Sequence, residues 1–241
     1  MVEKVRVSQY EEKKPNGNPS EEDYRWLEEN DLIRDGNTLE TVLAAEGVKN
    51  GTFIEVFLHD IDQEDFQQEY NEFIEGLTKL GLNVYVPREN KSEIADSEES
   101  MAMVTAYVTT CDFYSVRDFE EMPGRGTYET PDSSLQKAMF LGYPLKSAVG
   151  YKKRNMPDQE FEDTVRISDN ELEEEPEAME LFPSKIQKRI PSSEERKINL
   201  ISYGVFGDDD SIEKALKYAE EYFQTIQEVD EKYNTSFLNL I

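Results

Sequence analysis

The stretch from Cys111 to Leu145 is the part of this chain whose residue types best suit an active site. Its first part, CDFYSVRDF, is rich in aromatic and β-branched residues and predicts a strand. The middle part, EEMPGRGTYETPDSS, has two prolines, two glycines and several hydroxyl and carboxylate groups, which is typical of a loop. The last part, LQKAMFLG, predicts a helix that ends at Gly142. Open α/β sheets bind ligands at such polar loops between a strand and a helix, so we expect a functional site here.

Strands and helices alternate in the predicted elements around this loop. Residues 53–58 and 82–87 are predicted strands, and apolar residues at helical spacing between them predict a helix that ends at Gly81. A further helix over about residues 98–110 is expected to lead into the strand at Asp112. The sequence therefore predicts an α/β fold of the Rossmann-like (flavodoxin-like) kind, with a parallel sheet of four to five strands and helices on both faces.

The flanking regions complete the predicted domain organisation. Residues 1–50 are expected to form a partly helical N-terminal extension, with a helix capped by Ser20 and Asp23, and they show no residues that suggest chemistry. Residues 51–241 are expected to form the α/β domain, with a charged, proline-bearing insertion at about 151–196. Apolar residues spaced from Ile212 to Ile226 predict an amphipathic helix with Ser211 as its N-cap.

The net charge of −27 is the strongest compositional signal. It argues against a nucleic-acid partner, because phosphate binding needs clustered Lys and Arg. Two explanations stay open: a halophilic, high-salt cytoplasm that screens the repulsion, or a surface that mimics nucleic acid. One cysteine and one histidine give no basis for a disulfide, a Cys/His metal site or a Ser-His-Asp triad, so no metal and no cofactor are expected. No apolar run suits a membrane span and no signal peptide is evident, which predicts a cytoplasmic protein without a membrane partner.

Four segments resemble nucleoside 2-deoxyribosyltransferases and the related Rossmann-like nucleoside N-glycosidases. They occur in the family's order, and they are NVYVPREN at 83–90, CD at 111–112, GTYE at 126–129 followed by KAMFLGYPL, and INLISYG at 198–204. The resemblance implies an enzyme that cleaves or exchanges the N-glycosidic bond of a small-molecule nucleoside or nucleotide. It also implies a homo-oligomer, because Asn199 resembles a family asparagine that reaches the sugar in a neighbouring subunit.

The resemblance also assigns roles to individual residues. A carboxylate must stabilise or trap the oxocarbenium-like sugar, and a second carboxyl group must protonate the departing base. Glu129 is the expected nucleophile, with Asp118 or Asp112 as proton donor or orienting group. The expected substrate-binding residues come from the strand ends and loops, and they are Asn199, Gly126, Thr127, His59, Asp60 and Asn90.

Two further functions stay open beside the transferase. Ser134 and Val104 stand where the family has carboxylates, which would suit a catalytically silent relative that binds a nucleotide. The acidic composition would suit an interaction protein that mimics nucleic acid and binds a basic partner, with binding that weakens as salt rises.

Overall fold

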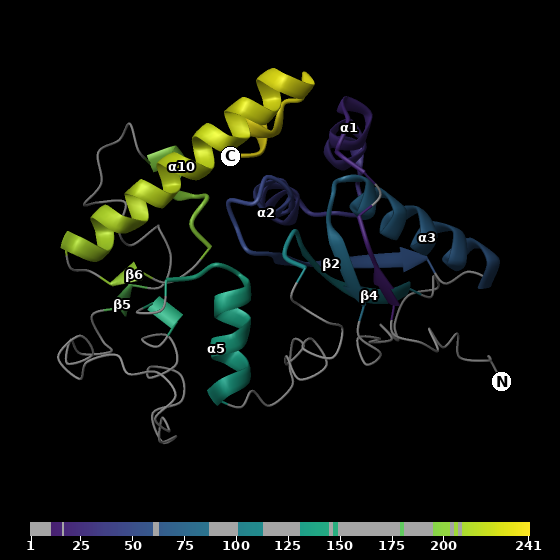
Figure 1. The fold of residues 1–241 in the computed structure, drawn as a ribbon, viewed down its shortest axis with the longest axis horizontal. Coiled ribbons are helices and arrows are strands. Elements are labelled where there is room, and N and C mark those ends of the chain that lie inside the picture. Colours follow the sequence, from purple (N-terminus) through teal and green to yellow (C-terminus); the bar gives the residue numbers. More distant parts are fainter. Residues whose placement is uncertain are drawn as a thin grey trace.

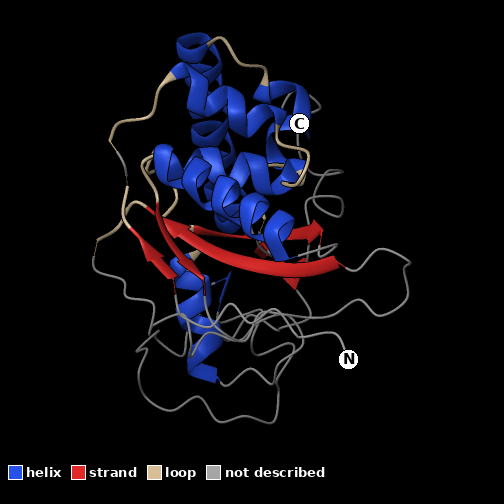
Figure 2. Cartoon of the chain, turned by 90° about the vertical axis from the view of Figure 1, so that its right-hand side faces the viewer, coloured by secondary structure: helices blue, strands red, loops and turns tan. Residues whose placement is uncertain are grey.

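Helices on one side of an antiparallel sheet form the body of the protein in the computed structural model (Figure 1; Figure 2). The structure describes residues 11–15, 17–59, 63–86, 101–112, 131–144, 147–148, 179–180, 195–202, 205–206 and 209–241. No helix within these ranges is long and apolar enough to cross a membrane.

The sheet has four strands in the order β1-β3-β4-β2, and every neighbouring pair is antiparallel. Its main part consists of β2 (Thr52–His59), β4 (Met101–Thr109) and β3 (Asn83–Val86). The three-residue strand β1 (Glu11–Lys13) adds an edge beside β3. β2 and β4 pair along their whole lengths, from Thr52 opposite Val108 to His59 opposite Met101.

The predicted Rossmann-like (flavodoxin-like) parallel sheet is therefore wrong. β2 and β3 do run in the same direction, since each is antiparallel to β4, and helix α3 (Gln63–Lys79) connects them. However, β4 lies between them and forms hydrogen-bonded ladders with both. The predicted β-α-β unit is thus a split one, in which a third strand occupies the place between the two connected strands.

The prediction is wrong at the segment MAMVTAYVTT, which is expected from the sequence to belong to a helix over about 98–110. This segment is strand β4, and its side chains alternate between the two faces of the sheet. Val104, Ala106 and Val108 belong to the core under the helices, whereas Tyr107 belongs to a second cluster on the other face. Four β-branched residues within Val104–Thr109 restrict side-chain rotamers in a helix and pack well in a strand.

The helices that cover the sheet mostly lie where the sequence predicted them. α1 (Glu21–Glu29), α2 (Asp35–Ala45), α3 and α10 (Asp209–Tyr233) cover one face, and α5 (Pro131–Phe140) lies on the other (Figure 2). The predicted cap of α1 is confirmed, because Asp23 Oδ2 accepts hydrogen bonds from the backbone N–H and the hydroxyl of Ser20. Gly81 and Gly142 adopt φ values of 77° and 72° at the predicted helix ends, and Gly47 adopts a φ of 72° after α2.

Short elements follow α5 in the chain. β5 (Met179–Glu180) pairs antiparallel with β6 (Val205–Phe206), and the one-turn helix α9 (Glu195–Ile198) precedes β6. After α10, the 3₁₀ helix η3 (Phe237–Leu240) ends the chain. The predicted strand beginning at Asp112 and the insertion at about 151–196 fall largely outside the described residues.

One hydrophobic core joins the helices to the sheet. It contains Tyr24 and Leu27 of α1, Val42 of α2, Val56 of β2 and Ile226 of α10, all fully buried. Each such side chain contributes about 1.5–3 kcal/mol relative to exposure. The predicted division of the chain at residue 51 stays a prediction, and these packed residues come from both sides of it.

Candidate functional site

Lys49 is the most deeply buried cationic side chain that the structure describes, with 1% of its surface exposed. The chain places it just after α2, where Gly47 turns the backbone and the N–H of Lys49 donates to the carbonyl oxygen of Leu43 at 3.1 Å. β2 begins three residues later, at Thr52. The side chain is therefore fixed between the end of a helix and the start of a central strand.

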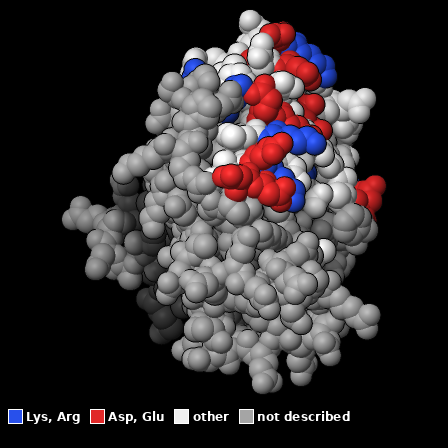
Figure 3. All heavy atoms as spheres, turned by 90° about the vertical axis from the view of Figure 1, so that its left-hand side faces the viewer, with Lys and Arg blue, Asp and Glu red and all other residues white. Residues whose placement is uncertain are grey.

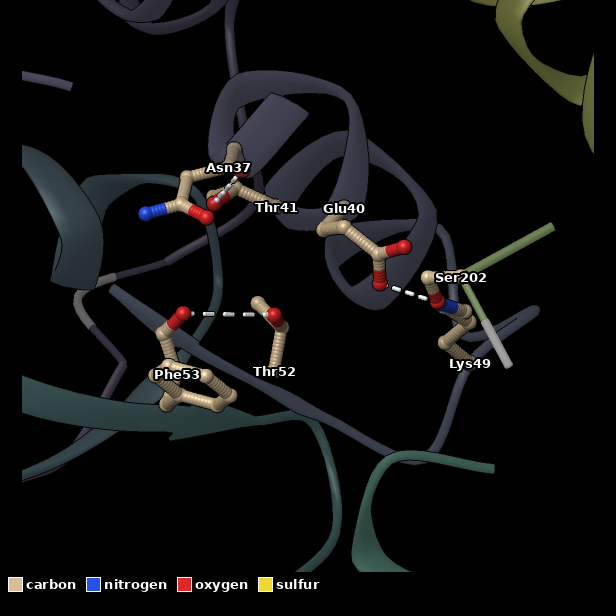
Figure 4. Close-up of polar contacts among 7 residues, drawn as sticks. All are labelled: Asn37, Glu40, Thr41, Lys49, Thr52, Phe53 and Ser202. Atoms are coloured by element: carbon tan, nitrogen blue, oxygen red, sulfur yellow. Dashed lines mark hydrogen bonds and ion pairs between the residues drawn. The ribbon is translucent and has the colours of Figure 1, made fainter. Parts of the chain in front are cut away.

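Four side chains from four other segments surround the Lys49 ammonium, and we call the group the Lys49 cluster. Glu40 of α2 forms an ion pair with Nζ, and Nζ also donates to Ser202 Oγ at 3.1 Å (Figure 4). The ammonium lies 5.9 Å from the ring centroid of Tyr143 and 5.5 Å from that of Tyr222. Its hydrogen-bond acceptors and aromatic neighbours offset part of the cost of removing a cation from water.

The two ends of this cluster differ in their access to solvent. The Glu40 side chain retains 17% of its exposure, while Ser202 lies on the surface. Burial raises the pKa of the Tyr222 phenol, and the negative charge of Glu40 raises it further. Tyr222 therefore stays neutral and presents the face of its ring to the cation. The arrangement is a surface hydroxyl with a buried ammonium–carboxylate pair behind it.

A second polar group fixes the end of β4. The buried amide of Asn83 donates to the carbonyl oxygen of Cys111 and to Asp112 Oδ1, both at 3.4 Å. Thr109 Oγ1 accepts from the N–H of Cys111 at 2.9 Å and donates to the carbonyl oxygen of Asn50. Asn83 Oδ1 is buried without a hydrogen-bond partner in the described part of the chain. These bonds determine the direction in which the chain leaves the sheet after β4.

Most of the predicted site residues fall outside the described part of the chain. They are Glu129, Asp118, Gly126, Thr127, Asp60 and Asn90. Asp112 is exposed directly after β4, and Asn199 is exposed in the turn after α9. His59 is the last residue of β2, opposite the first residue of β4.

The antiparallel register separates two of these residues. Because β2 and β4 run in opposite directions, His59 at the end of β2 and Asp112 after the end of β4 lie at opposite ends of the sheet. A parallel sheet would have brought both to the same edge. Asp112 instead lies at the end of the sheet that carries Lys49, which directly precedes β2.

No motif in the sequence points to the Lys49 cluster, and residues 1–50 show no pattern that suggests chemistry. Glu40 and Lys49 both belong to that range, and Ser202 lies 153 positions beyond Lys49. One local signal was present: a lysine stands between a glycine-terminated helix and a strand rich in Phe, Ile and Val. Such a position is close to the core, but only the tertiary structure shows that the side chain is buried.

The outward faces of α1 and α10 carry exposed carboxylates. Stacking of Tyr24 on Tyr233, with ring centroids 4.4 Å apart, holds α1 beside the C-terminal end of α10 (Figure 1). We call four exposed carboxylates on these two helices the acidic patch, and its members are Glu22, Glu29, Glu228 and Glu231. None of the four forms an ion pair with another residue that the structure describes.

Exposed basic residues also occur on both of these helices. Arg25 is paired with Glu21 on α1, and Lys214 is paired with Asp210 at the start of α10. On the face drawn in Figure 3, acidic and basic side chains of the described part are interleaved. The N-terminal half of α10 is therefore mixed in charge, whereas its C-terminal half carries Glu221, Glu228 and Glu231 before the next base, Lys232.

The described ranges contain no group of three or more His, Cys, Asp or Glu side chains that could hold a metal ion. No family model, no curated protein and no solved structure matches the chain.

Proposed function

We propose that this protein is an acidic interaction protein, which binds a basic surface of a partner that otherwise binds nucleic acid. The observation that carries the proposal is the acidic patch, whose carboxylates are exposed on two packed helices and form no ion pairs with described residues. Carboxylates held on rigid helices keep their spacing when a partner binds, so little conformational entropy is lost.

The overall charge acts in the same direction as the patch. At −27, the protein attracts basic surfaces over about one Debye length, which is about 10 Å at 0.1 M salt. Such attraction increases the rate of encounter and favours basic partners over acidic ones. A partner with clustered Lys and Arg, such as a nucleic-acid-binding surface, fits this field.

The nucleoside transferase interpretation stays a prediction that depends on the sequence resemblance. Its expected nucleophile, Glu129, falls outside the described residues, and the parallel sheet that it implied is wrong. Incubation of the protein with a deoxynucleoside and a different free base tests it directly. A new nucleoside would indicate the transferase and free base alone the hydrolase, whereas no turnover would count against both.

The interaction proposal can be tested with a fluorescent arginine-rich peptide. We expect saturable binding by fluorescence anisotropy, with affinity that falls as salt rises, and competition between the protein and single-stranded RNA for the peptide. A patch variant neutralises the four carboxylates of the acidic patch by the substitutions Glu22→Gln, Glu29→Gln, Glu228→Gln and Glu231→Gln. We expect it to bind about tenfold more weakly, as about 0.2–1 kcal/mol per exposed pair implies.

A control variant removes the same number of charges from elsewhere on the surface, and its substitutions are Glu72→Gln, Glu75→Gln, Asp210→Asn and Glu213→Gln. We expect this control to bind at most about twofold more weakly, because only the overall field changes. Equal losses in the two variants would show that net charge alone acts and that the patch has no special part. Absence of binding at low salt would contradict the proposal.

A further inference from the structure

Ser202 combines an exposed hydroxyl with a buried cation directly behind it. Its Oγ accepts a hydrogen bond from Lys49 Nζ at 3.1 Å, and Lys49 itself is 99% removed from solvent. Glu40 forms an ion pair with the same ammonium (Figure 4). The three functional groups therefore form a hydrogen-bonded row of carboxylate, ammonium and hydroxyl, in which the ammonium is the most buried member.

This row differs from the ion pairs on the helix surfaces of the protein. A buried ion pair loses hydration energy that its internal attraction does not fully return, so a well-packed apolar pair would often be more favourable. A lysine within hydrogen-bond reach of a serine hydroxyl is also one of the pairings by which proteins activate a nucleophile. The surroundings of Lys49 add two aromatic rings, from Tyr143 and Tyr222, whose centroids lie 5.9 Å and 5.5 Å from its ammonium.

We propose that Ser202 is a nucleophile, activated by Lys49 and Glu40, that accepts an acyl group from a small activated ester. Lys49 passes one ammonium proton to Glu40, and its nitrogen lone pair then takes the proton of the Ser202 hydroxyl. Oγ forms a bond to the acyl carbon while the bond from that carbon to the leaving oxygen breaks. The leaving alcohol takes the proton from Lys49, and the proton on Glu40 returns to Lys49. The products are an acyl ester of Ser202 and the free alcohol.

The exposed position of Ser202 gives the ester access to Oγ. Ser202 lies at the end of the described segment Glu195–Ser202, just after Leu200 and Ile201, which are buried in the core. The buried neighbours hold the backbone of Ser202 in place, while Lys49 holds its side chain. A hydroxyl held in one orientation loses less entropy on attack than one that rotates freely.

The chain offers a matched control serine. Ser236 is also exposed and its Oγ also forms a hydrogen bond, but the partner is the carboxylate of Glu28 and no lysine is involved. Reactivity that comes from exposure or from a carboxylate partner alone would therefore appear at both serines. Reactivity that comes from the Lys49–Glu40 pair would appear only at Ser202.

Labelling with a fluorophosphonate reagent, followed by peptide mass mapping, tests the proposal. In this reaction Oγ forms a bond to phosphorus, fluoride leaves, and the hydroxyl proton passes through the Lys49–Glu40 pair to solvent. We expect Ser202 to be modified at least about tenfold faster than Ser236, in line with the contribution of general bases. Ser202→Ala should abolish the fast adduct, and Ser236→Ala should leave its rate unchanged. A burst of p-nitrophenol from p-nitrophenyl acetate, lost in Ser202→Ala, should accompany it.

Two variants separate activation from structure. Lys49→Met should lower the labelling rate at Ser202 to that of Ser236, provided that circular dichroism shows a folded chain. Glu40→Gln keeps an acceptor for Lys49 and should fold, yet it removes the carboxylate that receives the proton, so we expect about a tenfold slower reaction. Equal rates at Ser202 and Ser236, absence of a Ser202 adduct, or an unchanged rate in folded Glu40→Gln would each overturn the proposal.

Discussion

The Lys49 cluster and the acidic patch both consist of charged side chains, but they differ in what surrounds each charge. Lys49 is enclosed by one carboxylate, one hydroxyl and two aromatic rings, and no water reaches most of its surface. The patch residues stand in water and form no ion pairs with described residues. The energy of the Lys49 charge therefore depends on the positions of the atoms that contact it. The attraction of the patch for a basic partner depends on how many carboxylates it contains.

Removal of the buried cation should have the largest effect on stability. Lys49→Met leaves the Glu40 carboxylate without its cation in a site that retains 17% of its exposure. We expect a loss of about 3–5 kcal/mol in the free energy of unfolding, the usual result of breaking one partner of a buried pair. Urea denaturation of the variant and the wild type measures it.

The double variant Lys49→Met with Glu40→Leu is the control for this prediction. It removes both charges and leaves apolar groups that fill part of the same space, so most of the lost stability should return. If the double variant is as unstable as Lys49→Met, the loss comes from packing and not from the uncompensated carboxylate.

How far the sequence predicts the fold depends on how local the signal is. Helix α3 could be predicted because Phe66, Tyr70, Phe73 and Leu77 recur at helical spacing within one segment. The sheet could not be predicted correctly, because the sequence predicts a helix over the segment Met101–Thr109 and the strand between β2 and β3 is therefore missing. Without β4 between them, β2 and β3 appeared to be neighbours, and a parallel sheet followed.

The candidate site also depends on contacts between segments that are far apart in the sequence. Asp112 and Asn199 were assigned to a site because they belong to short segments that resemble a family, and that assignment stays a prediction. The position of Asp112 depends on the sheet register, which no short segment encodes. Lys49 could not be recognised, since its burial requires Glu40, Ser202 and Tyr222 from three separate elements. Contacts across 153 positions leave no periodic signal in the sequence.

Alkaline pH should reveal the other buried ionisable groups. Burial raises the pKa of Tyr24, which also donates a hydrogen bond to Glu46, and burial raises the pKa of Tyr222. In the unfolded chain both phenols ionise near pH 10, while the folded chain keeps their protons. Their stabilisation is therefore complete below about pH 10 and is lost above it, by about 1.4 kcal/mol per pH unit for each tyrosine.

Urea denaturation at about pH 9 and at about pH 11 measures this loss, which should be close to 3 kcal/mol for the two tyrosines together. The double variant Tyr24→Phe with Tyr222→Phe should lose clearly less stability over the same range. An equal loss in the variant would assign the alkaline destabilisation to other groups.

Salt should affect the exposed charges more than the buried pair. At −27, surface carboxylates repel one another, and this repulsion falls as the Debye length decreases from about 10 Å at 0.1 M to about 3 Å at 1 M. We expect the melting temperature to rise by about 5 °C between these concentrations, equivalent to about 1–2.5 kcal/mol for a chain of this size.

The patch variant with four Glu→Gln changes should show a smaller rise, because fewer charges remain to be screened. A flat profile in the wild type would contradict both the repulsion argument and the halophilic interpretation of the composition. It would indicate that the acids are spaced too widely to interact.

The smallest effect should come from an exposed ion pair, which is the direct counterpart of Lys49 and Glu40. Arg25 and Glu21 form an i, i+4 pair on α1, with 44% and 52% of their side chains exposed. Because water solvates both partners before and after the pair is broken, Arg25→Gln should cost only about 0.2–0.5 kcal/mol in urea denaturation. The same change removes a positive charge beside the acidic patch, so the arginine-rich peptide should bind slightly more tightly to this variant. A loss of stability above about 1.5 kcal/mol would contradict this prediction. It would show that solvent exposure does not explain why the Arg25–Glu21 pair and the Lys49–Glu40 pair contribute differently to stability.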